Sequence, residues 1–350
     1  MHKGGKKTSE LLERKGIEMD TKYSIKQAII HIAYTCEHQC PMCYADSNNE
    51  REQPDFSQLC KVIDRLLELK INDITFVGGD PAVYGQIVEL AAYAKNNGAM
   101  LSVLSNTLDF NGKKNDVLKY IDTYEGTVHH SNSRKHDIFC GVDGAYDKLV
   151  GNLKFFSDHG KSVGLAINII PYNYNVLAEL VESVINKGVN IDHLVMQRII
   201  QFGRATGRNN FEITKKMLSE ALEQVEWLEN KYRIKVIFED PVPLCAIEKK
   251  YYRYMHPCEW GTTKVSVDYK GKLSRCGADV YHSFGSIFDD VDTLWNSDNN
   301  LKKFREKKYL PIKCQMCDLL DKCGGGCPIS RNPEQGFAAD YLSGECEKNE

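Results

Sequence analysis

Three cysteines near the start of the chain, Cys36, Cys40 and Cys43, follow one another in the pattern C-x3-C-x2-C. They come directly after residues 28–35 (AIIHIAYT), whose β-branched and aromatic side chains predict a strand. Thiolates this close together can converge on one metal centre, and a four-iron cluster has four positions for ligands. Three protein thiolates leave one iron free to bind a group that is not protein. The pattern therefore predicts a cofactor-binding loop at the end of a strand.

A zinc ion is the main alternative for this loop. Structural zinc sites take four ligands, but no fourth cysteine and no spaced pair of histidines stands nearby, apart from His31 and His38. A buried trio of structural thiols would not need such tight spacing. We favour the iron–sulfur interpretation because later segments of the chain agree with it.

The composition limits the class of protein. The chain has 350 residues, enough for a large domain and a smaller one, and its net charge of −3 gives no reason to expect nucleic acid or a membrane surface as a partner. No stretch approaches the roughly 20 apolar residues of a membrane span, and the basic N-terminus lacks the apolar core of a signal peptide. Thirteen cysteines in such a chain indicate metal or redox chemistry rather than disulfides, and we expect a cytoplasmic protein.

Strands and helices alternate through the first two thirds of the chain. The predicted strands are residues 28–35, 73–77, 100–105, 126–131, 162–170 and 191–199, and the predicted helices are 56–69, 87–95, 145–159, 176–186 and a long one that Thr214 caps and that ends at Tyr232. Six such repeats imply a parallel sheet with right-handed crossovers, partly closed into a TIM-like (β/α)6 barrel. Its chemistry is expected at the carboxyl ends of the strands. A further strand at 234–238 ends this region.

Glycines and polar residues stand at these expected strand ends. Gly78 and Gly79 follow the second strand, where the absence of a Cβ atom lets a backbone approach a ligand closely. The others at or near strand ends are Asp80, Pro81, Ser105, Asn106, Asn168, Gln197 and Arg198. Polar residues at strand ends also satisfy exposed backbone groups, so each has a purely structural alternative.

The cysteine loop after the first strand resembles that of the radical S-adenosylmethionine (SAM) enzymes. In that family the open iron binds the amino and carboxylate groups of SAM, and reduction yields a 5′-deoxyadenosyl radical that takes a hydrogen atom from a substrate. The resemblance implies that Gly78, Gly79, Asp80 and Pro81 form the family's G-G-E-P-like motif, which binds the methionyl amino group. Asp80 stands where Glu is commoner, and it keeps the acceptor chemistry.

The same resemblance implies further contacts to SAM. Ser105, Asn106 and Asn168 become candidates for the SAM carboxylate and ribose, and Arg198 for SAM or the substrate. Met42 stands where the family usually has an aromatic residue against the adenine, and Tyr44 is the nearest aromatic side chain.

A second set of cysteines lies near the C-terminus. It reads C-x12-G-x4-C, then C-x2-C-x5-C-x3-C, then one more, and it comprises Cys258, Cys276, Cys314, Cys317, Cys323, Cys327 and Cys346. Residues 264–276 alternate like a hairpin with its turn at 269–271. A zinc ribbon or a pair of zinc sites is the structural alternative. The spacing resembles the SPASM extension behind some radical SAM barrels, which carries two auxiliary 4Fe–4S clusters.

The resemblance also implies how these ligands divide. The first auxiliary cluster takes Cys258, Cys276 and Cys327, and the second takes Cys314, Cys317, Cys323 and Cys346. Two fully ligated clusters need eight thiolates, and this set supplies seven. Cys245 is a candidate for the eighth, and the alternative is an auxiliary cluster with an open iron.

Other cysteines and histidines have no predicted role as ligands. Cys60 lies on the apolar face of a helix and is interpreted as a core residue. His129 and His130 are neighbours in a predicted strand and would point to opposite faces, so they are not expected to bind one ion together. His136 and Cys140 fall in a predicted loop near the cavity, and Cys140 is expected to be unligated there.

These interpretations define a predicted organisation. An extension (1–26) precedes the radical SAM barrel (27–239), and a linker (240–257) leads to the SPASM domain (258–350). The predicted cofactors are SAM and three 4Fe–4S clusters, and the predicted electron donor is a flavodoxin or ferredoxin.

The resemblance implies an enzyme that abstracts a hydrogen atom from a ribosomally made peptide and installs an oxidative cross-link, a thioether or a C–C or C–O bond. The alternatives are a formylglycine (sulfatase-type) maturase, a radical SAM modifier of a small molecule, and a non-enzymatic electron carrier or sensor. Many peptide maturases of this group carry an N-terminal leader-recognition domain, whereas only about 27 residues precede the first strand here. We therefore expect recognition by a separate partner protein or by the barrel and SPASM surfaces.

Overall fold

The computed structural model describes residues 23–48, 53–106, 110, 112–279, 282–331 and 336–343. Its named strands form one ten-stranded sheet in the order β10-β9-β8-β1-β2-β3-β4-β5-β6-β7. In that part of the chain, none of the helices combines the length and the apolar character that a membrane crossing requires.

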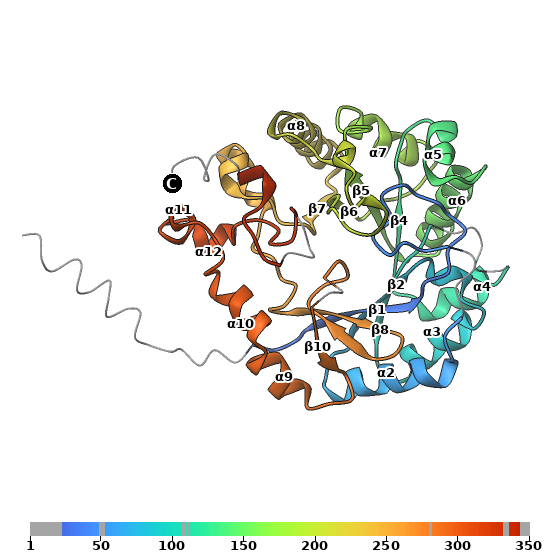
Figure 1. Cartoon of the computed structure of the whole chain (residues 1–350). Helices are drawn as coiled ribbons and strands as arrows, with labels where there is room; N and C mark the ends of the chain where they lie inside the picture. The colour runs from blue at the N-terminus through green and yellow to red at the C-terminus, as the bar shows by residue number, and fades with distance from the viewer. Residues whose placement is uncertain are drawn as a thin grey trace, which may run out of the picture.

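The first seven strands form the barrel. They are parallel and neighbour one another in chain order: β1 (Gln27–Ala33), β2 (Asp73–Gly78), β3 (Met100–Leu104), β4 (Thr123–Thr127), β5 (Ser162–Ile169), β6 (His193–Arg198) and β7 (Lys235–Phe238). Helices lie on the outer side of the curved sheet (Figure 1), the longer ones being α2 (Phe56–Glu68), α3 (Ile87–Asn96), α6 (Ala145–Asp158), α7 (Leu177–Ile185) and α8 (Lys215–Tyr232). The predicted partial barrel is confirmed.

The helix boundaries follow from local capping and amphipathic spacing. Asp55 caps α2 by accepting from the backbone N–H of Gln58, and the helix then buries Leu59, Ile63 and Leu66 against the sheet. Thr214 caps α8 as predicted, with its hydroxyl accepting from the N–H of Met217.

The region after the third strand differs from the prediction. Strand β4 is Thr123–Thr127 rather than 126–131, so His129 and His130 lie beyond its end. The predicted loop that contains Cys140 is in fact helix α5 (Ser133–Cys140), which Asn132 caps and which Gly141 ends at φ +72°. The amphipathic signal missed this helix because it buries only His136 and Cys140.

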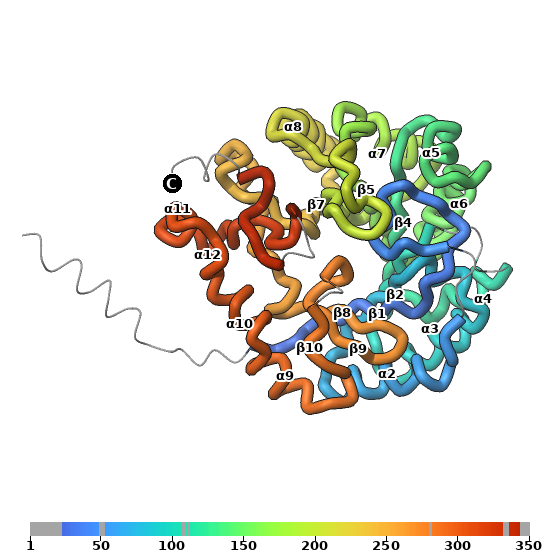
Figure 2. Tube along the Cα trace, in the orientation of Figure 1, coloured from blue at the N-terminus to red at the C-terminus, as the bar shows by residue number. Residues whose placement is uncertain are grey.

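The C-terminal region continues the same sheet. Strand β8 (Lys264–Asp268) pairs in parallel with β1 and forms the predicted hairpin with β9 (Lys272–Ser274), and β10 (Ser283–Ser286) pairs antiparallel to β9. Short helices follow: α9 (Val291–Ser297), α10 (Asn299–Glu306), α11 (Ile312–Gln315) and α12 (Leu320–Cys323). These helices lie beside the opening of the curved sheet, between its edge strands β10 and β7 (Figures 1 and 2).

One hydrophobic core serves both parts. The buried cluster that contains the barrel residues Ile30 and Phe76 also contains Val265, Leu273 and Trp295 of the C-terminal region. The cysteine-rich region is therefore packed onto the edge of the barrel rather than held at a distance. The predicted linker 240–257 contains two 3₁₀ segments, η5 (Leu244–Ala246) and η6 (Lys249–Tyr254).

Candidate functional site

The carboxyl ends of the parallel strands meet at one edge, and most predicted site residues stand there. The cysteine loop follows β1, the Gly-Gly-Asp-Pro turn follows β2, and Ser105 follows β3. Asn168 and Arg198 are the last or next-to-last residues of β5 and β6. The register of neighbouring strands therefore brings together residues that are far apart in sequence.

The cysteine loop is held by its own backbone and by a second loop. The N–H of Cys36 donates to the carbonyl of Asn48 at 3.1 Å, and the N–H of Arg204, in the loop after β6, donates to the carbonyl of Cys43 at 2.9 Å. Gly203 has φ +57°, and a Cβ atom there would lie 2.4 Å from the Cys43 carbonyl oxygen. Only glycine fits this contact, which the sequence analysis missed. A lone glycine in a loop carried no signal by itself.

The environments of these cysteines differ. Cys36 is buried, and burial, with the nearby Asp80 carboxylate, raises its thiol pKa. The side chain of Cys140 lies beside Cys40 and holds the pKa of Cys40 well below its usual value. A low pKa favours the thiolate, which is the form that binds metal.

The two glycines let β2 pack directly against the start of the cysteine loop. A Cβ atom on Gly78 would lie 1.9 Å from the carbonyl oxygen of Ala33, and one on Gly79 would lie 2.2 Å from that of Thr35. The N–H groups of Gly79 and Asp80 donate to these two carbonyls at 2.8 and 2.9 Å. The predicted close approach thus includes the protein's own backbone.

Asp80 links three strand ends. Its buried carboxylate accepts from the hydroxyl of Ser105 at 2.6 Å and from the N–H groups of Ala82 and Asn106 at 3.0 Å. The side-chain oxygen of Asn106 in turn accepts from the N–H of Thr127 at 2.7 Å. These contacts hold the ends of β2, β3 and β4 in register, and direct contacts of these side chains with SAM remain predictions.

Two other residues predicted to contact SAM, Met42 and Arg198, are packed inside the protein. Met42 is buried in a small apolar cluster with Ile170 and Phe211. The buried Arg198 guanidinium pairs with Asp340 at 2.6 Å and donates to the carbonyl of Pro241. Arg198 thus ties β6 to the C-terminal region, and this geometry favours a structural role over the predicted contact with SAM.

The second cysteine set includes a buried trio, Cys258, Cys276 and Cys327. Arg275 points Nη1 at the sulfur of Cys258 and Nη2 at the sulfur of Cys276, each at 3.6 Å, and pairs with the buried Asp279 at 2.7 Å. Burial raises the pKa of Cys276 to about 12, and the positive charge of Arg275 opposes that rise. The sequence analysis did not identify Arg275. Its position immediately before Cys276 was the one feature of the sequence that could have indicated a role beside the cysteines.

Cys327 is held at the end of a run of three glycines. Gly324, Gly325 and Gly326 have φ values of +65°, +84° and +81°, which side chains rarely tolerate. The N–H of Cys327 donates to Asp340 at 2.8 Å, so the carboxylate that pairs with Arg198 also positions this cysteine.

The remaining cysteines of the second set are more accessible. Cys317 is exposed, and Cys314 and Cys323 are half-buried. Cys346 lies outside the described residues. Cys245 is exposed and lines a surface hollow with Ser219 of α8. Both the role of Cys245 as the eighth ligand and the alternative of an open iron stay predictions.

A cavity of about 400 Å³ lies between the two cysteine sets. Its lining includes Tyr44, which follows Cys43, and Gly277, which follows Cys276, together with Asp268 and Lys272 of the β8–β9 hairpin. His31 of β1 also lines it and is only 2% exposed.

His31 is the most buried polar residue in the lining of this cavity. Its ring stacks on Tyr34 and meets Tyr44 edge-on, and neither ring nitrogen has a hydrogen-bond partner in the described part of the chain. Burial lowers its pKa to about 4, so the imidazole is neutral. A neutral imidazole can both donate and accept a hydrogen bond.

A partial barrel that presents a cysteine loop at its active edge, with a second cysteine-rich region packed on its open side, defines an iron–sulfur enzyme. Residues 30–184 match the family model of the radical SAM superfamily, and residues 258–318 match that of the SPASM iron–sulfur cluster-binding domain. The chain thus contains a radical SAM domain and a SPASM domain. It is therefore an enzyme that uses SAM and iron–sulfur clusters.

Relatives and solved structures agree with this assignment. The chain is 24% identical over 315 residues to the antilisterial bacteriocin subtilosin biosynthesis protein AlbA of Bacillus subtilis, covering 86% of this chain and 66% of AlbA, just under two thirds of that protein. It is 21% identical over 323 residues to the AdoMet-dependent heme synthase of Nitratidesulfovibrio vulgaris, covering 84% of this chain and 85% of that one. Its fold is similar to Streptococcus suis SuiB bound to the precursor peptide SuiA, with a TM-score of 0.72 at 16% identity over 95% of this chain and 78% of SuiB.

Proposed function

We propose that this enzyme is a peptide maturase, which removes a hydrogen atom from a ribosomally made peptide and installs an oxidative cross-link, a thioether or a C–C or C–O bond. The observation that supports the proposal is the cavity whose lining includes the residues that directly follow Cys43 and Cys276, so a substrate side chain bound there would lie near both cysteine sets. AlbA serves the biosynthesis of a bacteriocin, and SuiB binds a precursor peptide, which supports a peptide as the substrate.

The cysteines present fit three 4Fe–4S clusters. We propose that Cys36, Cys40 and Cys43 hold the cluster that binds SAM, and that the buried trio holds the first auxiliary cluster. The second auxiliary cluster takes Cys314, Cys317, Cys323 and Cys346. When bound, SAM supplies the 5′-deoxyadenosyl radical that removes the hydrogen atom. The electron donor is a flavodoxin or ferredoxin.

The residues around the cavity have distinct roles in this proposal. The turn from Gly78 to Pro81 would hold the methionyl end of SAM, and Asp80 keeps this turn in place by accepting from Ser105 and from the N–H of Asn106. Tyr34 and Tyr44 pack around His31 and exclude water from it.

Oxidative cross-linking requires the removal of one further electron and one proton after the hydrogen atom has left. The first auxiliary cluster, which Cys258, Cys276 and Cys327 would hold, would accept that electron. The neutral imidazole of His31 is placed in the cavity wall to accept that proton. The guanidinium of Arg275 lies beside Cys258 and Cys276, where it can balance added negative charge. In this proposal His31 therefore handles the proton, and Arg275 balances the charge.

The test uses the full chain with its clusters reconstituted under anaerobic conditions. SAM, a reductant and a peptide encoded beside the gene are added, and the peptide is analysed by mass spectrometry. We expect 5′-deoxyadenosine together with a peptide lighter by two hydrogen atoms. Cleavage of SAM with no change in peptide mass across the neighbouring open reading frames would count against a peptide substrate.

A small molecule is the second candidate substrate, and the similarity to a heme synthase over 85% of that relative's length favours it. The two candidates differ in how SAM cleavage responds. A peptide substrate raises the rate of 5′-deoxyadenosine formation in the presence of the peptide alone, whereas a small-molecule substrate leaves that rate unchanged until cell extract below peptide size is added.

A further inference from the structure

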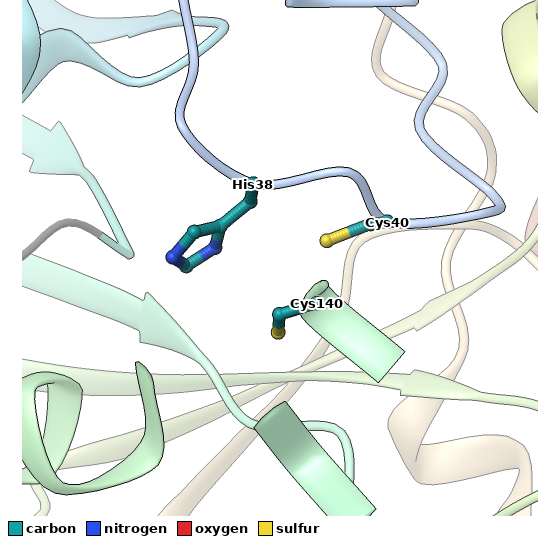
Figure 3. A group of neighbouring side chains, drawn as sticks. All are labelled: His38, Cys40 and Cys140. Carbon is teal, nitrogen blue, oxygen red and sulfur yellow. The ribbon is translucent and has the colours of Figure 1, made fainter. Parts of the chain in front are cut away.

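Three side chains in and beside the cysteine loop lie close together, although the proposed cross-linking reaction does not require this arrangement. The ligating atoms of His38, Cys40 and Cys140 all lie within 4.8 Å of one another, and Figure 3 shows the three side chains as neighbours. His38 and Cys40 belong to the cysteine loop, and Cys140 ends helix α5. No other trio of histidine, cysteine or acidic side chains in the described residues meets this limit.

His38 is available as a ligand. It is 2% exposed, and both of its ring nitrogens lack a hydrogen-bond partner in the described part of the chain. A buried imidazole without partners is costly, because its polar atoms have lost water and gained nothing. A bound cation would satisfy it.

The sulfur of Cys140 is oriented by a histidine behind it. The backbone N–H of His129 donates to Nδ1 of His136 at 3.1 Å, so the neutral His136 ring carries its proton on Nε2. That Nε2 lies 3.3 Å from the Cys140 sulfur and therefore donates to it. Hydrogen bonds of this kind, from a residue behind a ligand, orient metal-binding side chains.

A fourth donor lies alongside. Nε2 of His129 is 4.0 Å from the sulfur of Cys40, and contacts with the rings of His136 and Phe139 fix its position. His129 and His130 lie beyond β4 and so are not the strand neighbours of the prediction, and His130 accepts from the N–H of Asn132. His129 nevertheless reaches a cysteine from another loop, which sequence spacing could not reveal.

The dimensions and the ligand types fit one borderline cation. Tetrahedral zinc has Zn–S distances of about 2.3 Å and Zn–N distances of about 2.0 Å, so its ligand atoms lie about 3.5–3.8 Å apart. Side-chain shifts of about 1 Å would bring the atoms from within 4.8 Å to that geometry. Two thiolates with imidazoles select Zn²⁺ or Fe²⁺ over hard cations such as Mg²⁺.

We propose that His38, Cys40 and Cys140, with His129 as the fourth donor, bind a single Zn²⁺ ion when the SAM cluster is absent. Cys40 cannot serve this ion and the cluster at once, so the two metals compete. The contact between the N–H of Gln39 and the carbonyl of Cys140 at 2.7 Å keeps α5 against the loop and so keeps the competing site assembled. Zinc at this site therefore opposes assembly of the SAM cluster. The proposal is independent of the substrate.

The first test uses full-length protein that carries Cys36→Ser and Cys43→Ser. These changes remove two cluster ligands and keep Cys40, and the auxiliary clusters stay loaded. We expect one Zn²⁺ per chain by metal analysis, with an affinity measured by competition against a chromophoric chelator. Adding Cys140→Ser should weaken zinc binding at least about 100-fold, since loss of a partner behind a ligand alone costs 10–100-fold. His38→Ala should have a similar effect.

Two matched controls accompany this test. Cys60→Ser removes a buried cysteine on α2, and His130→Ala removes a histidine adjacent to His129, and neither should change the affinity. Unchanged iron content shows that each variant keeps its fold. Equal zinc affinity with and without Cys140, or no zinc bound by the double variant, would overturn the proposal.

The second test needs no change to the cluster ligands. Zn²⁺ is added to cluster-free wild-type chain and to Cys140→Ser before reconstitution, and the iron bound afterwards is measured. Zinc should reduce cluster assembly in the wild type and have much less effect on Cys140→Ser. The same loss in both proteins would contradict the competition.

Discussion

The two cysteine regions are held in different ways. The loop with Cys36 is supported by the barrel, since Gly79 and Asp80 in the turn after β2 donate two backbone hydrogen bonds to its start and the loop after β6 donates another to its end. The second region is held by buried charges, the pairs Arg275–Asp279 and Arg198–Asp340, and by very short helices. We therefore expect the barrel edge to form without metal and the second region to depend on its clusters, as small metal-binding units generally do.

The largest expected difference between the regions is the effect of replacing one cluster ligand on SAM cleavage. Cys36→Ser should abolish formation of 5′-deoxyadenosine, because it removes a proposed ligand of the cluster that binds SAM. Cys276→Ser should leave SAM cleavage measurable and abolish the product. Both are measured in one anaerobic assay by chromatography. Loss of SAM cleavage in both variants would mean that the regions are not separable.

Arg275→Ala tests the buried charges of the second region. It leaves Asp279 buried and unpaired, which should destabilise the protein by about 3–5 kcal/mol. The control Lys216→Ala breaks the more exposed pair with Glu220 and should cost about 1 kcal/mol or less. Hydrogen exchange should show the loss in residues 258–331 while barrel strands stay protected. A uniform loss would contradict the distinction.

Gly78→Ala tests the backbone contact of the first region. The added Cβ would meet the carbonyl oxygen of Ala33 at 1.9 Å, and the φ of +145° is strained for any side chain, so we expect a loss of about 3 kcal/mol. Gly151→Ala in α6, where a Cβ meets open space, should be neutral or stabilising. Chemical denaturation measures both. Similar free energies of unfolding for the two variants would refute the close packing of β2 on the loop.

The smallest expected effect concerns pH and the cavity between the regions. The folded pKa of His31 is about 4, below its unfolded value of 6.5, so the unfolded chain binds the extra proton as the pH falls. Stability from this residue is complete above pH 6.5 and is lost progressively toward pH 4. Between pH 7.5 and 5.5 the loss should be about 1 kcal/mol. His31→Asn should remove that share of the pH dependence, and an unchanged slope would mean that the imidazole is already protonated or solvated.

Local patterns accounted for much of the fold. Thr214 and the apolar spacing of α2 predicted helix boundaries, because caps and periodicity act within a few residues. The prediction failed at β4 and α5, where short segments with few buried apolar residues carry little periodic signal. There the packing of neighbouring strands decided the boundaries.

The sequence by itself determined the class of this protein, because the spacing of cysteines along a loop limits which metal centre they can share. Only the tertiary structure decided which distant groups stand beside those cysteines. Asp340 reaches Arg198 across 142 positions of sequence, and Cys140 comes within 4.8 Å of Cys40 from another connection of the barrel. Such neighbours depend on strand order and helix packing, and these are set by the burial of the whole core rather than by any short pattern.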